Sequence, residues 1–160
     1  MDKRVPFIDT LIELAEKDDK IVLIVADVGF KHADRFKERF PNRYFNLGVT
    51  EQSCVMIAVG MAAGGFKPYF YSMINFVLFR PAEMVRNGVV CHKANVKLIG
   101  VSGSEKYKFL GFSHNLSHDK EDTAFCSNIG LGYRVPDSEE DVRWIIQRQY
   151  QLEMPFYIRL

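Results

Sequence analysis

Short apolar runs alternate with longer amphipathic stretches along the whole chain. The run from Ile21 to Ala26 contains no polar residue, which is typical of a parallel strand covered on both faces. Similar runs recur, and stretches with helical spacing of apolar residues separate them. The predicted strands span residues 21–26, 44–47, 67–71, 96–101, 132–135 and 156–160. The predicted helices span residues 6–17, 31–39, 50–63, 76–92, 119–128 and 138–151.

This alternation predicts the fold class. We expect an α/β domain with a doubly wound, mostly parallel six-stranded sheet and helices on both faces. A chain of 160 residues that is 48% hydrophobic suits one domain, spanning residues 1–160. In open sheets of this kind ligands gather beyond the carboxyl ends of the strands. We therefore expect a ligand site at the strand ends formed by Asp27 and residues 48–51, 72–75 and 102–118.

Charge and hydropathy exclude several classes of function. The 21 basic and 20 acidic residues are interspersed, so we expect no nucleic-acid partner. No apolar run reaches the roughly 20 residues that span a bilayer, and the amino terminus is unlike a signal peptide. We therefore expect no membrane association and a cytoplasmic location.

Cys54, Cys91 and Cys126 lack the paired spacing of a disulfide framework or zinc site, and we expect core thiols.

Glu51 is the most informative residue of the chain. It directly follows the predicted strand 44–47 and the turn after it, and it begins a helix of small apolar residues. A charge there is costly without a partner, so Glu51 is expected inside the fold or against another chain. The alternative is that Thr50 caps the helix and Glu51 is an ordinary first-turn acid.

The stretch from Gly48 to Gln52 resembles the signature of the transketolase family, in the domain that holds the aminopyrimidine ring of thiamine diphosphate. The resemblance extends over nearly the whole chain. It implies that Glu51 is catalytic and cofactor-binding, with its carboxyl group hydrogen-bonded to the N1′ atom of the ring. An apolar pocket favours the neutral form of a carboxyl group, which then can share a proton with the ring.

The first strand end also matches the family. Ala26-Asp27-Val28-Gly29, followed by a helix and Pro41, is similar to the order that precedes the glutamate in transketolases. The resemblance implies that Asp27 lies near the cofactor. Helix capping at a strand-to-helix turn is an equally consistent role for Asp27.

The segment from Tyr71 to Asn87 is similar to a family segment around an arginine, with Arg80 as a cofactor contact. Family members pack the ring between aromatic residues three and six positions before this arginine. Here those positions hold Val77 and Ile74, which we therefore include as candidate ring contacts. Phe76 and Phe79 supply an aromatic contact if the register shifts by one, although aromatics at helical spacing are also typical of a core.

His114 is the candidate for substrate contact. Gly111-Phe112-Ser113-His114 looks like the family element that reaches the substrate, and an imidazole can position it or transfer a proton. Two differences stand out, because Asn115 replaces the usual His or Gln and residues 116–121 lengthen the loop. His114 and His118 are four residues apart near acidic residues, so a metal site is an alternative. Our prediction is that this chain holds no metal.

The chain contains no Gly-Asp-Gly, the sequence with which thiamine enzymes hold the diphosphate and Mg²⁺. The resemblance therefore implies a partner chain that carries the diphosphate-binding domain and the Mg²⁺, in a homo- or hetero-oligomer. It also implies a split transketolase-like enzyme that transfers a two-carbon ketol unit between sugars or sugar phosphates. Two alternatives stay open: the beta-type subunit of a 2-oxo acid dehydrogenase or decarboxylase, and a non-catalytic interaction module of the same fold.

Overall fold

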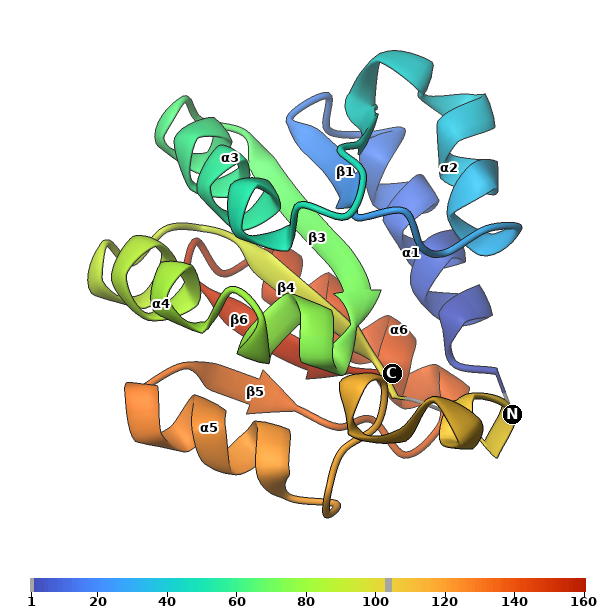
Figure 1. The fold of residues 1–160 in the computed structure, drawn as a ribbon. Helices are drawn as coiled ribbons and strands as arrows, with labels where there is room; N and C mark the ends of the chain where they lie inside the picture. Colours follow the sequence, from blue (N-terminus) through green and yellow to red (C-terminus); the bar gives the residue numbers. More distant parts are fainter. Residues whose placement is uncertain (1, 103–104) are drawn as a thin grey trace.

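Six strands form one sheet in the computed structural model, which describes residues 2–102 and 105–160 (Figure 1). Their order is β2-β1-β3-β4-β6-β5, and each neighbouring pair is parallel. The strands are β1 (Ile21–Val25), β2 (Tyr44–Asn46), β3 (Lys67–Met73), β4 (Lys97–Val101), β5 (Gly132–Arg134) and β6 (Phe156–Arg159). The predicted fold class is confirmed, and the sheet is parallel throughout.

Helices cover both faces of this sheet (Figure 1). One layer contains α1 (Arg4–Ala15), α2 (His32–Arg39) and α6 (Glu139–Tyr150). The other contains α3 (Glu51–Ala63), the π-helical η2 (Asn75–Phe79), α4 (Ala82–Met84), the π-helical η3 (Val85–Cys91) and α5 (Glu121–Ile129). The short 3-10 helices η1 (Pro41–Arg43) and η4 (Glu105–Ser113) lie in connections. None of the helices in the described residues has the length and apolar character needed to cross a bilayer.

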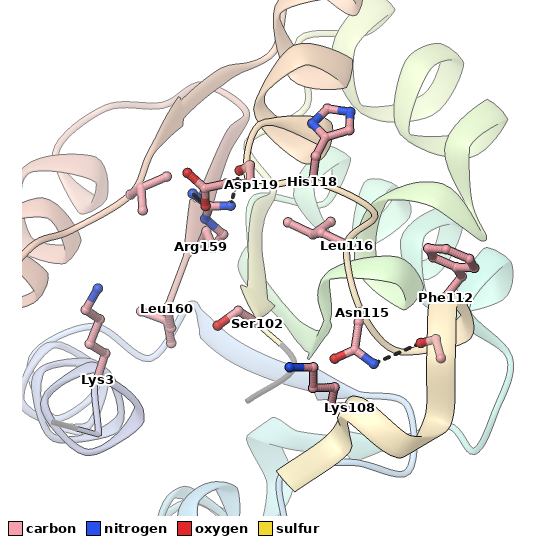
Figure 2. A pocket seen from close by; sticks show the side chains of 12 residues that line it. Lys3, Ser102, Lys108, Phe112, Asn115, Leu116, His118, Asp119, Arg159 and Leu160 are labelled. Atoms are coloured by element: carbon pink, nitrogen blue, oxygen red, sulfur yellow. Dashed lines mark hydrogen bonds and ion pairs between the residues drawn. The ribbon is translucent and has the colours of Figure 1, made fainter. Parts of the chain in front are cut away.

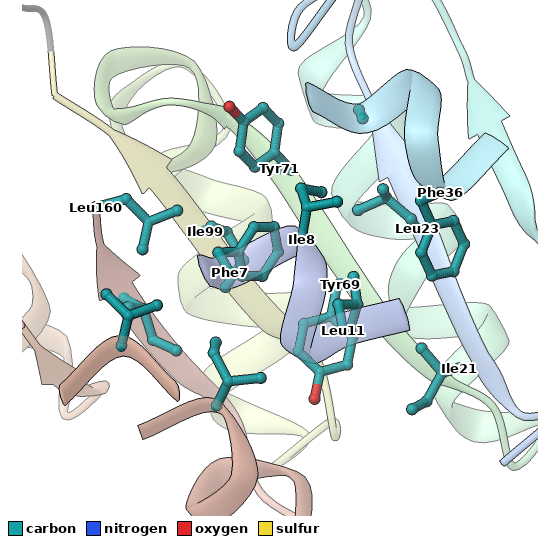
Figure 3. Close-up of a cluster of buried hydrophobic side chains, with 14 of the residues drawn as sticks. Phe7, Ile8, Leu11, Ile21, Leu23, Phe36, Tyr69, Tyr71, Ile99 and Leu160 are labelled. Carbon is teal, nitrogen blue, oxygen red and sulfur yellow. The ribbon is translucent and has the colours of Figure 1, made fainter. Parts of the chain in front are cut away.

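The two cores explain why the strands are apolar at consecutive positions. Along β1, Ile21, Leu23 and Val25 pack with α1 and α2, whereas Ile24 belongs to the cluster under α3. Figure 3 shows the first cluster, in which Phe7 and Ile8 of α1 lie over the sheet. Every residue of β1 is buried. A strand covered on both faces must be hydrophobic throughout, as its sequence predicted.

The predicted helix 76–92 is wrong as a single element. The backbone leaves helical geometry at Pro81, which has φ −95° and ψ 27°, and splits the segment into η2, α4 and η3. Proline lacks the N–H needed to continue a helical ladder. Just before the break, the N–H of Arg80 donates to the carbonyl of Asn75, five residues earlier, at 2.8 Å. This wide turn determines which side chains of the segment face the ligand-binding edge of the sheet.

The cysteine prediction holds for two residues and fails for one. Cys54 and Cys126 are buried, whereas Cys91 is exposed because it lies at the end of η3, beyond the buried Val89. Burial raises the pKa of the Cys54 thiol and raises the pKa of Cys126 to about 12. Neither buried thiol is therefore an accessible nucleophile.

Candidate functional site

A pocket of 540 Å³ opens at the carboxyl ends of β1, β3 and β4. Strand β1 has β2 on one side and β3 on the other, so successive connections leave it in opposite directions. Such a switch point is where doubly wound folds bind ligands. The residues predicted from the sequence that line this switch-point pocket are Asp27, Glu51, Phe76, Arg80 and His114.

Glu51 is inside the fold, with 3% of its surface exposed. It is the first residue of α3, and Thr50 precedes it without making a side-chain cap. The hydroxyl of Thr50 instead donates to the carbonyl of Leu47 at 2.8 Å. The expected threonine cap is therefore wrong. Glu51 is an acid in the first turn of α3, but it is buried and lines the pocket.

The carboxylate of Glu51 has a counter-charge. Nη1 of Arg80 donates to Oε1 of Glu51 at 2.6 Å, and the Arg80 side chain is 42% exposed. The guanidinium carbon of Arg80 also lies 4.0 Å from the ring centroid of Phe76, a cation–π contact. The arginine offsets the cost of burying a charged carboxylate. The sequence indicated that a charge at Glu51 needs a partner, and Arg80 is that partner.

His114 lies beside the same aromatic ring. The rings of His114 and Phe76 meet edge to face with their centroids 4.9 Å apart. Nδ1 of His114 is 2.7 Å from the hydroxyl of Ser113, which donates its one hydrogen to the carbonyl of Leu110 at 3.0 Å. In the neutral imidazole this network assigns the proton to Nδ1 and leaves Nε2 as the basic nitrogen.

Asp27 lies at the pocket rim and does not cap α2. Its backbone has φ 51°, and its N–H donates to Oδ1 of Asn46 at 3.0 Å. The same Asn46 oxygen accepts the N–H of Gly48 at 3.1 Å. Helix α2 begins only at His32, where the N–H of the preceding Lys31 donates to Asp34. Asn46 thus connects Asp27 to the turn that leads to Glu51.

The structure corrects two predicted ring contacts, Ile74 and Val77. Both are buried in the core beneath η2, at 1% and 0% exposure, and neither lines the switch-point pocket. In the π-helical turn Phe76 and Arg80 share the pocket-facing side, which leaves Ile74 and Val77 toward the sheet. Phe79 packs edge to face on Phe125 instead, so of the two candidates Phe76 lines the pocket and Phe79 does not.

Two polar residues of the strand end 72–75 were not among the predicted site residues. Nδ2 of Asn75 donates to the carbonyls of Phe112 and Asn115 at 2.8 and 3.3 Å, and so holds the His114 loop to η2. Ser72 lines the pocket, and its fully buried hydroxyl has no hydrogen-bond partner in the described part of the chain. Their position directly at the end of β3 was the signal that could have identified them.

A second pocket, of 660 Å³, lies on the other side of η4 and contains none of the predicted cofactor contacts (Figure 2). Its wall includes His118 and Arg159, and Arg159 is already bonded to Asp119 at 3.1 Å and Asp122 at 3.2 Å. His114 and His118 line different pockets. Within residues 2–102 and 105–160, no three His, Cys, Asp or Glu side chains are grouped so as to hold a metal ion.

Comparison with known proteins agrees with this geometry. The family model of the transketolase pyrimidine binding domain matches residues 2–160. The chain is 30% identical over 158 residues to a subunit of the apulose-4-phosphate transketolase of Phocaeicola vulgatus, covering 98% of this chain and 50% of that protein. It is also 30% identical over 156 residues to a subunit of the 6-deoxy-6-sulfo-D-fructose transketolase of a Clostridium species, covering 96% and 48%.

A solved structure, described as a split gene transketolase, inactive beta4 tetramer, is similar with a TM-score of 0.85 and 29% identity. The similarity covers 99% of this chain and 50% of that one. The chain thus spans about half the length of each of these relatives. The resemblance seen in the sequence is confirmed, and the chain belongs to the transketolase pyrimidine-binding domain family.

Proposed function

We propose that this chain supplies the pyrimidine-binding half of a thiamine diphosphate-dependent transketolase, which moves a two-carbon ketol unit between sugars or sugar phosphates. The observation that carries the proposal is the position of Glu51. A carboxylate that is 3% exposed lines a pocket at the switch point of the sheet. Buried carboxylates at such sites are expensive and are kept where function needs them.

The pocket has the groups that an aminopyrimidine ring requires. A planar heterocycle needs a flat apolar surface and hydrogen-bonding groups at its edge. Phe76 offers an aromatic face, and Glu51 offers a carboxylate next to it. The buried hydroxyl of Ser72 has no partner in the described residues and can serve a ligand. These residues fit the ring of thiamine diphosphate.

Each residue has a defined task in this proposal. Thiamine diphosphate, when bound, supplies the nucleophilic carbon for breaking and forming carbon–carbon bonds next to a carbonyl group. Glu51 holds the ring at N1′ and shares a proton with it. Phe76 contacts the ring, and Asp27 contributes at the rim. His114 holds or moves a proton of the substrate through Nε2, because Nδ1 is engaged with Ser113.

A partner chain completes the proposed enzyme. We assign the diphosphate and Mg²⁺ to that partner, because this sequence has no Gly-Asp-Gly. A surface on α3 is suited to contact it, since residues 52–66 carry no charge. Met56 and Ile57 on this helix are 46% and 40% exposed, and Val49 before it is 65% exposed. Contiguous apolar surface of this kind marks protein interfaces.

The test is the variant Glu51→Gln in the complex with the partner chain. Glutamine retains the shape but cannot share a proton with the ring, so we expect ketol transfer to fall by about 10²- to 10⁴-fold. The melting temperature of the variant is measured alongside to show that it folds. A variant that transfers at the wild-type rate would contradict the proposal. A complex that fails to bind thiamine diphosphate would favour the non-catalytic module.

A further inference from the structure

We propose that the guanidinium of Arg80 is a placeholder for the aminopyrimidine ring, and that it occupies the ring's site until the ring displaces it. This inference rests on the proposed function, because it concerns the same pocket. It differs from the expectation that Arg80 simply adds a contact to the bound cofactor. In the placeholder role Arg80 competes with the ring.

The contacts of Arg80 are the ones that the ring would make. Its Nη1 donates to Oε1 of Glu51 at 2.6 Å, and its guanidinium carbon lies 4.0 Å from the centroid of Phe76. A guanidinium is planar and delocalised, carries N–H donors along its edge and stacks on aromatic faces. An aminopyrimidine shares these properties. A ring that stacks on this face of Phe76 and also reaches Glu51 therefore overlaps with the guanidinium.

Arg80 is placed so that it can leave. Its side chain is 42% exposed, whereas that of Glu51 is 3% exposed. The residue directly follows η2 and precedes the break at Pro81, and its guanidinium lies outside the buried core cluster. Movement of the side chain into solvent therefore leaves the packing of Ile74 and Val77 unchanged.

Departure of Arg80 alone is unfavourable, because it leaves a buried carboxylate without a partner. On arrival of the ring, one proton taken up from solvent is shared between N1′ and the Glu51 carboxyl group, so Glu51 is partnered both before and after the exchange. The consequence is a chain that keeps the Glu51 carboxylate paired in the absence of cofactor. The same contact lowers the affinity of the chain for the ring.

The experiment titrates purified chains with thiamine, which carries the aminopyrimidine ring but no diphosphate, and measures binding by calorimetry. We expect Arg80→Gln to bind thiamine about tenfold more tightly than the wild type, because one charge-assisted hydrogen bond no longer has to be broken. Arg80→Lys keeps the charge but loses the planar fork, and its affinity should lie between the two. The control is Arg86→Gln, an exposed arginine that donates to Asn87 and should bind like the wild type.

Thermal melting shows whether the variants fold, and Arg80→Lys carries the test if Arg80→Gln does not. The double variant Glu51→Gln with Arg80→Gln should not show the tenfold tighter thiamine binding, because it lacks the carboxyl group that holds the ring. Equal or weaker thiamine binding by folded Arg80→Gln or Arg80→Lys would overturn the placeholder and show that the arginine assists the ring or is indifferent to it. That result would not contradict the proposed function, which is tested separately by the rate of ketol transfer in the Glu51→Gln complex.

Discussion

Replacement of Arg159 by Met tests the buried polar network behind the His114 loop. Asp122 is fully buried, and its carboxylate accepts from the hydroxyl of Tyr157 at 2.8 Å and from Nη1 of Arg159 at 3.2 Å. Arg159 also donates to the carbonyl of Asp119 at 2.6 Å. The arginine is thus the counter-charge of a buried acid and ties the start of α5 to β6.

The magnitude follows from what the substitution leaves behind. In Arg159→Met the carboxylate of Asp122 keeps only the hydroxyl of Tyr157. Removing one partner of a buried ion pair costs about 3 to 5 kcal/mol, and the remaining hydrogen bond places the expected loss near 3 kcal/mol. The ion pair with Asp119 adds little, since its carboxylate is 85% exposed. Asp122→Asn should cost less, about 1 to 3 kcal/mol, because no charge remains without a partner.

Urea unfolding followed by circular dichroism measures these losses as shifts in the midpoint at constant slope. The double variant Arg159→Met with Asp122→Asn should be less destabilised than the sum of the single losses, by about 1 kcal/mol or more. Arg148→Met, an exposed residue of α6, is the matched control and should change stability by less than about 0.5 kcal/mol. A loss under about 1 kcal/mol for Arg159→Met, or strict additivity, would refute the assignment of a coupled buried network.

Two further predictions concern the strands and the opposite edge of the sheet. In Gly100→Ala the new Cβ would lie 2.6 Å from the hydroxyl oxygen and 2.8 Å from the ring carbon Cε2 of Tyr157, so we expect a loss of about 1 to 3 kcal/mol in urea unfolding. Burial raises the pKa of Asp18, but hydrogen bonds led by that from Lys67 outweigh it, and the net pKa lies below the ordinary value. Asp18 therefore stabilises the fold above the pKa that it has in the unfolded chain, and this contribution is lost as the pH falls through its pKa in the folded chain. In Asp18→Asn the unfolding free energy should thus fall less steeply between about pH 5 and pH 3. An unchanged acid slope in that variant would count against the prediction.

Much of the fold could be read from the chain because its signals are local. The continuous apolar run at 21–26 predicts a strand buried on both faces, and β1 is such a strand. The helix after Thr50 ends at Ala63, just before Gly64 and Gly65, as predicted. The segment 76–92 was mispredicted as one helix because its apolar periodicity continues across Pro81, where the backbone turns.

The site was predictable in its elements but not in its contacts. Glu51, Phe76 and His114 lie on three separate segments, each of which follows a predicted strand, and the structure brings them to one pocket. Ile74 and Val77 were selected by counting back from Arg80, which assumes an ordinary helical turn. The π-helical geometry of η2 sends them to the core instead.

The sequence by itself determined the parallel α/β class, the strand ends and the one carboxylate that begins α3. These properties depend on periodicity and turn chemistry, which act between near neighbours in the chain. Only the tertiary structure decided that Arg80 pairs with Glu51 over the face of Phe76, and that Ser72 stays without a partner in the described residues. Pairings between separate segments depend on where the backbone directs each side chain, and no local pattern encodes that direction.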